Sequence, residues 1–371
     1  MIPVLKPSYG TEEAEAVAEV LRSGWTGLGP KTQEFETAFS KFIGEDVFTV
    51  GMNSCTSALH AALLIHEVGP GDEVLVPALN FVSGAHVISQ CGAKPVWIDV
   101  LKDTLCADPT DIAKKITKKT KAIVVMHYGG HPCAMDNIKF VAGDIPIIED
   151  AAHACGAYYR NVRIGSLGNT TCFSFHAVKN LSMGEGGAVV THNKELRDRL
   201  LKLRWLGINK STSDRSTAKS YNWDYSVEQL GFKYHLSDIA AAIGLVQLRN
   251  LDIANSRRRQ IAKMYNNGFR DFWPVTTPTV DASVITAQHL YVIQVRAKKR
   301  AALMDSLTEY GVGYSVHYKP VFEHPVYTSE DHKCPVTAEV AMQILSLPMH
   351  LNIDNCDVEH IIDAVKGGLS L

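Results

Sequence analysis

Short apolar runs that alternate with segments of helical periodicity constrain the fold of this chain more than any other feature. The runs 73–77, 94–100 and 122–126 are rich in Val and Ile, and helical patterns separate them. Such continuous runs are typical of strands that are buried on both faces of a parallel sheet. Further runs of this kind lie at 145–148, 171–175 and 187–191. We therefore predict an α/β fold with a mostly parallel central sheet covered by helices.

The length of 371 residues favours two domains over one. A polar, Ser/Thr-rich stretch at 208–224 predicts a long surface loop, and loops of this length are often functional lids. The part of the chain after residue 275 has its own strand and helices, which predicts a smaller α+β domain. We place the large domain at 1–249 and the small C-terminal domain at 250–371. The elements predicted after the loop are helices at 238–250 and about 253–272, a strand at 290–296, and helices at 299–310, 337–345 and 358–365.

Composition excludes several classes of function. Lys plus Arg is 37 and Asp plus Glu is 39, so the net charge of −2 predicts neither a nucleic-acid partner nor an anionic-membrane surface. The eight cysteines are scattered without a Cys-x-x-Cys pair, which predicts free thiols in a reducing compartment. No run approaches the ~20 apolar residues of a membrane span, and the N-terminus does not resemble a signal peptide. We expect a soluble, cytoplasmic protein.

Lys179 is the most informative single residue. It follows the apolar run 171–175 and precedes the glycine-rich stretch 184–187. A lysine at the mouth of a buried strand is well placed to lose its charge, and a neutral lysine forms Schiff bases with carbonyl groups. An isolated lysine is far more often an exposed surface charge. The interpretation of Lys179 as a Schiff-base lysine therefore needs a second motif.

Asp150 supplies this second motif. It stands where the run 145–148 ends, at the edge of the sheet where open α/β folds bind their ligands. Taken alone, it is equally well a helix N-cap. The interval to Lys179 allows one excursion of the chain and a return to the same edge. Enzymes that use pyridoxal 5'-phosphate (PLP) need a lysine for the aldehyde and an acid for the pyridine nitrogen, so the two motifs together favour this class.

The phosphate of such a cofactor needs hydrogen-bond donors. The segment 53–59 places hydroxyl groups and free backbone N–H groups at the start of a helix, where anions bind. An ordinary Ser/Thr cap explains the same residues, so this motif is weak by itself. Ser174 offers another hydroxyl on the strand that precedes Lys179.

At this point the chain resembles the nucleotide-sugar aminotransferase family, whose members are PLP-dependent enzymes of fold type I (aspartate aminotransferase-like). The similarity runs from about residue 1 to residue 368 in the order and spacing of the family, and the pair EDAAHA and SFHAVKN is its most specific part. The motifs that carry it are NSCTSALHAAL, GDEVLVPALNFVSG, GAKPVWIDV, TKAIVVMHYGG, IIEDAAHACGA, GSLGNTTCFSFHAVKNLSMGEGGAVVT and GVGYSVHYKP.

The resemblance implies roles for individual residues. Lys179 would hold PLP as a Schiff base and act as the catalytic acid and base, and Asp150 would pair with the pyridine nitrogen. His153 would face the phenolic oxygen of the cofactor, at a position where many members carry Gln. The remaining implied ligands are Phe81, which stacks on the ring, Thr56, Ser57 and Ser174 for the phosphate, and Trp25, Thr26, His317 and Tyr318 near the substrate.

Two departures from the family pattern stand at 231–235, where the chain reads GFKYH and many members read GYNYR. Lys233 replaces an Asn that reaches the phosphate of the neighbouring subunit in a homodimer with active sites at the subunit interface. An ammonium group could make the same contact with a full charge. His235 replaces the Arg, which leaves the contacts to the amino donor open.

We predict a homodimeric PLP-dependent aminotransferase that aminates a keto-sugar nucleotide, such as a 4-keto-6-deoxyhexose, with glutamate as donor. Alternative acceptors are a phosphorylated small ketone and a keto-acid sugar. The dehydratase branch of the family carries His at the position of Lys179, which argues against it. From another class, a PLP-binding regulator without turnover stays open. His127 and His131 have helical metal-ligand spacing, but Gly129 and Gly130 argue against a helix, so we predict no metal site.

Overall fold

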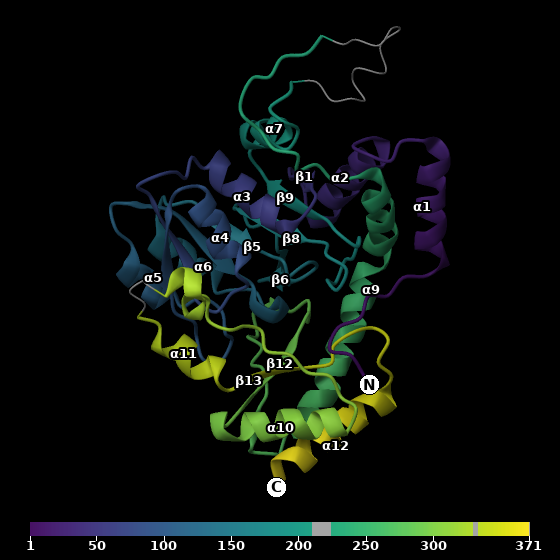
Figure 1. Cartoon of the computed structure of the whole chain (residues 1–371), viewed down its shortest axis with the longest axis vertical. Coiled ribbons are helices and arrows are strands. Elements are labelled where there is room, and N and C mark those ends of the chain that lie inside the picture. The colour runs from purple at the N-terminus through teal and green to yellow at the C-terminus, as the bar shows by residue number, and fades with distance from the viewer. Residues whose placement is uncertain (210–223, 329–332, 371) are drawn as a thin grey trace.

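The computed structural model describes residues 1–209, 224–328 and 333–370. Its centre is a seven-stranded sheet with the strand order β1-β9-β8-β5-β4-β2-β3 (Figure 1). Neighbouring strands are parallel except around β9, which pairs antiparallel with both β1 and β8. The mostly parallel α/β sheet predicted from the apolar runs is thus confirmed. The strands are β1 (Phe48–Met52), β2 (Glu73–Pro77), β3 (Lys94–Ile98), β4 (Thr120–Met126), β5 (Ile147–Asp150), β8 (Thr170–Ser174) and β9 (Gly187–Thr191).

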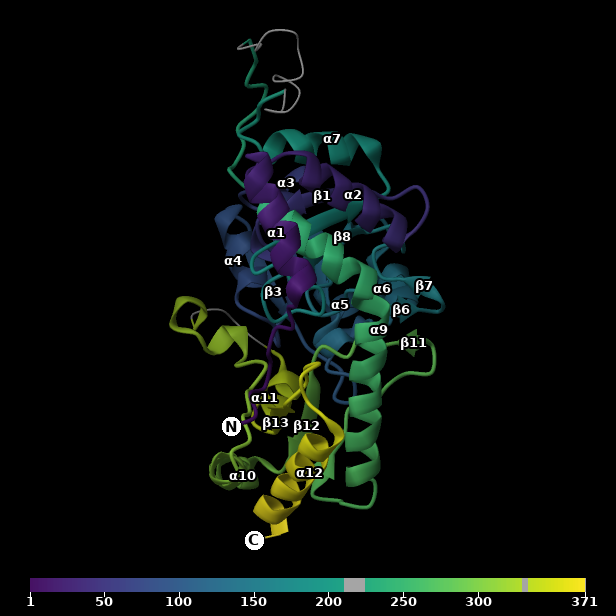
Figure 2. The ribbon, with the colours of Figure 1, turned by 90° about the vertical axis from the view of Figure 1, so that its right-hand side faces the viewer.

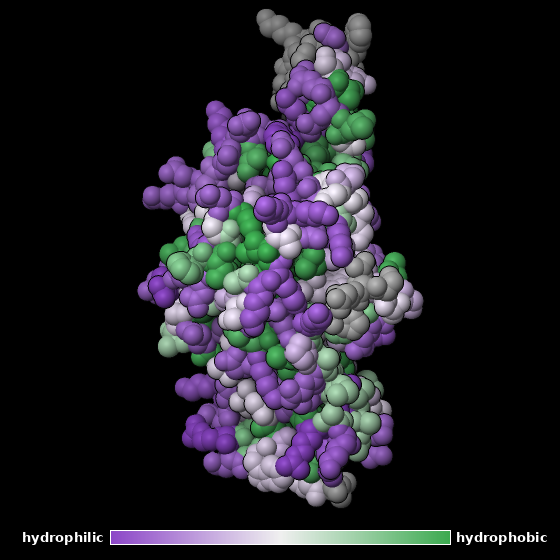
Figure 3. All heavy atoms as spheres, turned by 90° about the vertical axis from the view of Figure 1, so that its left-hand side faces the viewer, coloured by the Kyte–Doolittle hydropathy of each residue, from purple (hydrophilic) through white to green (hydrophobic). Residues whose placement is uncertain are grey.

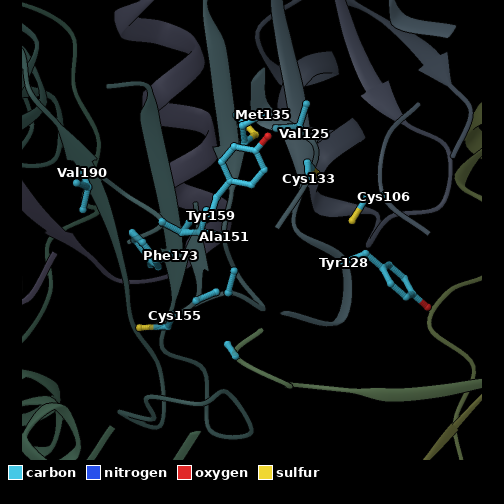
Figure 4. Packing of buried hydrophobic residues seen from close by; sticks show 14 of the residues in the cluster. Cys106, Val125, Tyr128, Cys133, Met135, Ala151, Cys155, Tyr159, Phe173 and Val190 are labelled. Carbon is cyan, nitrogen blue, oxygen red and sulfur yellow. The ribbon is translucent and has the colours of Figure 1, made fainter. Parts of the chain in front are cut away.

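Helices cover both faces of this sheet. In β4, Val124 packs into one hydrophobic cluster, whereas Ile123 and Val125 pack into the other. Phe173 and Val190 lie with Val125 on this second face (Figure 4). Burial on both sides explains why the strands read as continuous apolar runs. One face is covered by α3 (Cys55–Ile65), α4 (Ser83–Gln90) and α7 (Lys194–Leu203). The other is covered by α2 (Pro30–Ile43), α5 (Pro109–Lys115), α6 (Met135–Ala142) and the first half of α9 (Asp238–Phe269).

A second, smaller unit lies at the C-terminal end of the chain (Figure 1). Its antiparallel three-stranded sheet packs with the second half of α9 around a third hydrophobic cluster. The predicted helix at 337–345 is partly wrong, because its last residues belong to a strand that pairs with β12. The elements are β10 (Val275–Thr276), β12 (Tyr291–Val295), β13 (Ile344–Leu347), α10 (Ala297–Glu309), α11 (Pro335–Ala341) and α12 (Asn355–Ser370).

Helix α9 (Asp238–Phe269) connects the two units (Figure 2). The prediction of two helices was wrong here, because no Gly or Pro occurs within 245–267 to interrupt the 32-residue helix. Leu251 packs into the core of the large unit, and Tyr265 packs into the core of the small one. The predicted domain boundary between 249 and 250 falls inside this helix and stays a prediction.

The first residues of the chain lie against the small unit rather than the large one. The N–H of Ile2 donates to the carbonyl of Gly311 (2.8 Å), and the N–H of Met349 donates to the carbonyl of Val4 (2.8 Å). The helix α1 (Thr11–Ser23) then packs on α9. Because these contacts are non-local, the sequence carried no signal for them.

Smaller elements connect these parts. A third sheet joins the large unit to the segment before β12 through antiparallel pairs. Its strands are β6 (Tyr158–Tyr159), β7 (Val162–Arg163) and β11 (Val284–Ile285), and the 3-10 helices are η1 (Tyr128–Gly130), η2 (Val321–Glu323) and η3 (Pro325–Tyr327). Most of the loop predicted at 208–224 lies outside the described residues.

On the face shown in Figure 3, hydrophilic and hydrophobic side chains are intermixed, as is usual for a globular protein surface. Among the described residues, no helix is both long and apolar enough to cross a membrane.

Candidate active site

A cavity of about 310 Å³ lies at the carboxyl ends of the central strands, between the two units. This is the position where open α/β sheets bind ligands. The large unit contributes Thr56, Phe81, Asp150, His153, Ser174 and Lys179 to its lining. The C-terminal part of the chain contributes His289, His317 and Tyr318. The structure therefore brings most of the predicted site residues together.

Lys179 lies in the turn that follows β8, where its N–H donates to the carbonyl of His176 (2.8 Å). No described residue hydrogen-bonds its Nζ. Burial lowers the pKa of Lys179 to about 8, although the charges of Asp150 and Cys55 act in the opposite direction. A substantial fraction of Lys179 is thus neutral near physiological pH, which is the form that attacks a carbonyl carbon.

Asp150 is the last residue of β5 and is only 3% exposed. Its Oδ1 accepts the N–H of Ala152 (3.0 Å) and lies 4.0 Å from Sγ of Cys55. No described residue donates to its Oδ2. Burial raises the pKa of Asp150, whereas the Ala152 N–H and the charge of Lys179 favour the carboxylate. A buried carboxylate with an open acceptor oxygen suits the N–H of a pyridinium ring.

The N-terminus of α3 opens onto the same cavity. Ser54 caps this helix by accepting the N–H of Ser57 (3.1 Å), and the Ser57 hydroxyl donates to Oδ1 of Asn53 (2.6 Å). The backbone N–H groups of Cys55 and Thr56 have no partner among the described residues, so they are available to an anion. Ser57 does not line the cavity because its hydroxyl is engaged in this cap. Its predicted phosphate contact stays a prediction.

Gly187 allows the chain to pass close to this cap. A Cβ atom on Gly187 would lie 2.4 Å from the backbone carbon of Ser54, closer than atoms can approach. The absence of a side chain in β9 thus lets the strand and the helix start lie side by side at the anion-binding end of the cavity.

Phe81 presents an aromatic surface to the cavity. Its side chain is 53% exposed although it is large and hydrophobic, and its ring centroid lies 5.8 Å from that of Tyr318. An exposed ring in a ligand-sized cavity is suited to stack on a planar ligand.

His153 and Tyr318 are joined by a hydrogen bond that the sequence did not predict. The N–H of Gly129 donates to Nδ1 of His153 (3.3 Å), which places the proton of the neutral ring on Nε2. Burial lowers the pKa of His153 well below its ordinary value, so the ring is neutral. Its Nε2–H therefore donates to the Tyr318 oxygen (3.0 Å), and the Tyr318 hydroxyl proton is left for a ligand.

The comparisons with known proteins agree with this geometry. The family model described as "DegT/DnrJ/EryC1/StrS aminotransferase family" matches residues 7–366. The chain belongs to this family. The spore coat polysaccharide biosynthesis protein SpsC of Bacillus subtilis is 40% identical over 98% of this chain and 96% of its own length.

Solved structures of sugar aminotransferases resemble the whole chain. The aminotransferase TlmJ from Streptoalloteichus hindustanus is 34% identical, with a TM-score of 0.93 over 100% of this chain and 99% of its own. The putative sugar aminotransferase Spr1654 from Streptococcus pneumoniae, in its PMP form, is 31% identical, with a TM-score of 0.94 over 100% and 99% of the two chains. The predicted family, fold type, enzyme class and cofactor are confirmed: the protein is a PLP-dependent aminotransferase of fold type I.

Besides Ser57, three of the residues that the family resemblance singled out do not line the cavity of their own chain. Trp25 and Thr26 lie in the exposed loop before α2. Lys233 is also exposed, and its Nζ lies 3.8 Å from the centroid of the Trp205 ring. His235 also packs against this Trp, with ring centroids 4.7 Å apart, and burial lowers the pKa of His235 to about 4. The roles predicted for Trp25, Thr26 and Lys233 stay predictions.

Sequence reasoning missed other residues that line this cavity. His289 lines the cavity just before β12, and Leu5 reaches it from the N-terminal segment. His176 and Glu185 also line it, with Nε2 and Oε1 3.7 Å apart. A single His before a strand or a Leu near the N-terminus gives no periodic or motif signal, because only the tertiary fold places it beside Lys179.

Proposed function

We propose that this aminotransferase transfers the amino group of glutamate to the keto group of a sugar nucleotide of the 4-keto-6-deoxyhexose type. The observation that carries the transamination chemistry is the pairing of Lys179 and Asp150 in one cavity, with the Lys179 Nζ and the Asp150 Oδ2 both open to a ligand. The family to which the chain belongs is one of aminotransferases, which favours turnover over a role as a PLP-binding regulator.

The residues present fit the cofactor. PLP, when bound, supplies an electron-withdrawing ring that stabilises negative charge on the carbon next to the amino group. Asp150 would accept the pyridine N–H and keep the ring protonated. Thr56, Ser174 and the free amides at the start of α3 would bind the phosphate, and Phe81 would stack on the ring.

Lys179 would carry the proton transfers. Its Nζ would hold the cofactor at rest. Once the donor amine has displaced it, the free amine of Lys179 would remove the proton from the α-carbon of glutamate. It would then deliver this proton to the cofactor carbon that carried the aldehyde, and hydrolysis would release 2-oxoglutarate. With the keto-sugar, Lys179 would move a proton in the opposite direction, from that cofactor carbon to the sugar carbon that receives the amino group. The lowered pKa of Lys179 lets the same nitrogen act as base and acid near neutral pH.

Tyr318 and His317 would contact the substrate side of the cavity. The Tyr318 hydroxyl keeps its proton because burial raises its pKa, so Tyr318 would donate to an oxygen of the ligand. Burial lowers the pKa of His317 to about 4, and its Nδ1 lies 2.8 Å from the Ser346 hydroxyl. Both side chains therefore present neutral polar groups to the substrate.

The nature of the acceptor is supported by the relatives rather than by the cavity. SpsC is named for polysaccharide biosynthesis and Spr1654 as a putative sugar aminotransferase. A phosphorylated small ketone and a keto-acid sugar remain alternative acceptors on the same scaffold. Each would use the same donor half of the reaction.

A panel of keto-sugar nucleotides with glutamate as donor tests this function. We expect amination of at least one 4-keto-6-deoxyhexose nucleotide, measured as the amino sugar and 2-oxoglutarate formed in equal amounts. Phosphorylated ketones and keto-acid sugars belong in the same panel. If one of these is the preferred substrate, the acceptor assignment is wrong. If glutamate fails to react even in the first half-reaction, a role as a PLP-binding regulator gains support.

The site is proposed to be completed by a second subunit. Lys233 is exposed and outside the cavity of its own chain, while Thr56 is exposed at the mouth of that cavity. We propose a homodimer in which Lys233 reaches the phosphate that the other subunit binds. A phosphate carries close to two negative charges, which favours a cationic partner.

Subunit mixing tests Lys233. We expect a Lys233→Ala protein to bind PLP less tightly, with a deficit that shrinks at high salt, because the lost contact is electrostatic. Mixed with Lys179→Ala protein, it should regain activity, since one of the two sites in a hybrid dimer holds both wild-type residues. At a PLP concentration that leaves the Lys233→Ala dimer largely unloaded, random mixing predicts about a quarter of wild-type activity. Inactive hybrids, with subunit exchange confirmed, would disprove the shared site.

A further inference from the structure

Asn180 directly follows Lys179 and is buried, with 5% of its surface exposed. Its Nδ2 donates to Oδ1 of Asn255 (2.7 Å) and to the carbonyl of Ala287 (2.7 Å). Its Oδ1 accepts the Nδ1–H of His289 (3.0 Å). The side chain next to the reactive lysine therefore makes three hydrogen bonds to residues that are distant in sequence.

Asn255 extends this hydrogen-bond network to the loop that follows Asp150. It lies on α9, is 1% exposed, and donates from Nδ2 to the carbonyl of Cys155 (2.9 Å). Cys155 belongs to the loop after β5 (Figure 4). Gly156 has a φ of +84°, and a Cβ there would lie 2.6 Å from Nδ2 of Asn255, so the close approach requires glycine. Asn255 thus joins the loop after Lys179 to the loop after Asp150.

His289 completes the network. Because the Asn180 oxygen accepts from Nδ1, the proton of the neutral ring is on Nδ1 and the lone pair is on Nε2. His289 lines the cavity, its ring centroid lies 4.5 Å from that of His153, and no described residue hydrogen-bonds its Nε2. Within the described chain, the one hydrogen bond of the His289 ring therefore goes to Asn180.

We propose that Asn180, Asn255 and His289 act as a positioning clamp that holds Lys179 and Asp150 at a fixed separation and keeps Lys179 in its dry environment. The inference rests on the roles proposed above for Lys179 and Asp150. Asn180 and Asn255 act through the two loops that they connect rather than by contact with a ligand. His289 acts on Lys179 through Asn180. Rigid support of this kind is what a site with defined geometry needs.

The pKa of Lys179 can be measured in the protein without catalysis, and it should depend on the clamp. The amine reacts with trace acetic anhydride only when it is neutral, so the labelling rate rises with pH through the pKa of the lysine. Burial lowers this pKa to about 8 from an ordinary value of 10.5. A loosened loop admits water, which favours the ammonium, so the midpoint should move upward. The titratable groups that act on Lys179 are Asp150, Cys55, His153, His289 and His317.

The test labels the cofactor-free, full-length protein across pH and maps the Lys179 peptide by mass spectrometry. We expect a midpoint near pH 8 in the wild type. We expect an upward shift of about one pH unit or more in Asn255→Ala and His289→Leu. His289→Asn should restore the wild-type midpoint, because its amide N–H can replace Nδ1–H toward Asn180. Burial keeps His289 neutral over this range, so neither His289 variant removes a charge.

Asn250→Ala is the matched control, because Asn250 lies on the same helix and donates only to the carbonyl of Val246 in that helix (3.5 Å). Circular dichroism checks that each variant is folded. If Asn255→Ala does not fold, the comparison of His289→Leu with His289→Asn tests the clamp. A midpoint that stays near the wild-type value in folded His289→Leu overturns the clamp, and so does a wild-type midpoint near 10.5. Labelling needs neither cofactor nor sugar, so a failed substrate panel would leave this test valid.

Discussion

A Lys179→Ala protein is expected to lose transamination by about 10⁴-fold or more, because it lacks both the covalent attachment and the group that moves the proton. It should still bind PLP weakly through Thr56, Ser174 and the free amides at the start of α3. The loss is measured as the rate of the single-turnover half-reaction with glutamate. In the wild type, borohydride should bleach the yellow colour and fix the cofactor on the Lys179 peptide.

Lys298→Ala provides the control for this substitution. Lys298 is an exposed residue of α10 that does not line the cavity, so its removal should leave the half-reaction unchanged. A reduced cofactor found on a peptide other than that of Lys179 would contradict the proposed mechanism. Near-normal turnover of folded Lys179→Ala protein would do the same.

Asp150→Asn is expected to slow the half-reaction by about 10²–10³-fold while the fold and much of the cofactor binding persist. The amide has nearly the shape of the carboxylate but no charge, so it cannot hold the ring nitrogen protonated. The substitution should not destabilise the fold through burial. Burial already disfavours the charged form of Asp150, as its raised pKa shows, and the amide carries no charge. Rates come from the same single-turnover measurement, and circular dichroism confirms the fold.

Glu149 offers a matched control on the same strand. It faces away from the cavity, where its Oε2 accepts from Nε2 of His127 (2.8 Å) and its Oε1 accepts from Asn169 (2.6 Å). Glu149→Gln changes a buried carboxylate one residue from Asp150 and should leave the half-reaction rate near wild type. If Asp150→Asn is as fast as Glu149→Gln, Asp150 is a structural cap rather than the partner of the pyridine nitrogen.

The pH dependence of the half-reaction rate should reflect the titration of Lys179. Lys179 acts as a base only when it is neutral, so activity is expected to rise as pH increases toward its pKa of about 8. His153, His289 and His317 have lowered pKa values because they are buried, so they remain neutral over this range. They therefore do not add a second titration near neutral pH.

Much of the architecture could be predicted from local sequence. Strands buried on both faces read as apolar runs, and β2 and β9 have the predicted bounds. The pair of Lys179 and Asp150 could also be predicted. Asp150 ends one strand, Lys179 follows the neighbouring strand, and the carboxyl ends of parallel strands meet at one edge of the sheet. Short, weakly apolar β1 was missed, because its Thr and Gly residues dilute the strand signal.

Tertiary structure decided everything that depends on contacts between distant segments. The sequence alone determined an α/β PLP enzyme with a lysine and an aspartate at one sheet edge, since strand periodicity and motif spacing are local properties. Only the folded chain places His289 beside Asn180, and His153 within hydrogen-bonding distance of Tyr318. The tertiary structure also places Ser57 in the cap of α3 and lets the single helix α9 pack against both units. These features arise from side-chain packing and from hydrogen bonds between segments up to 165 residues apart, for which a linear pattern has no signature.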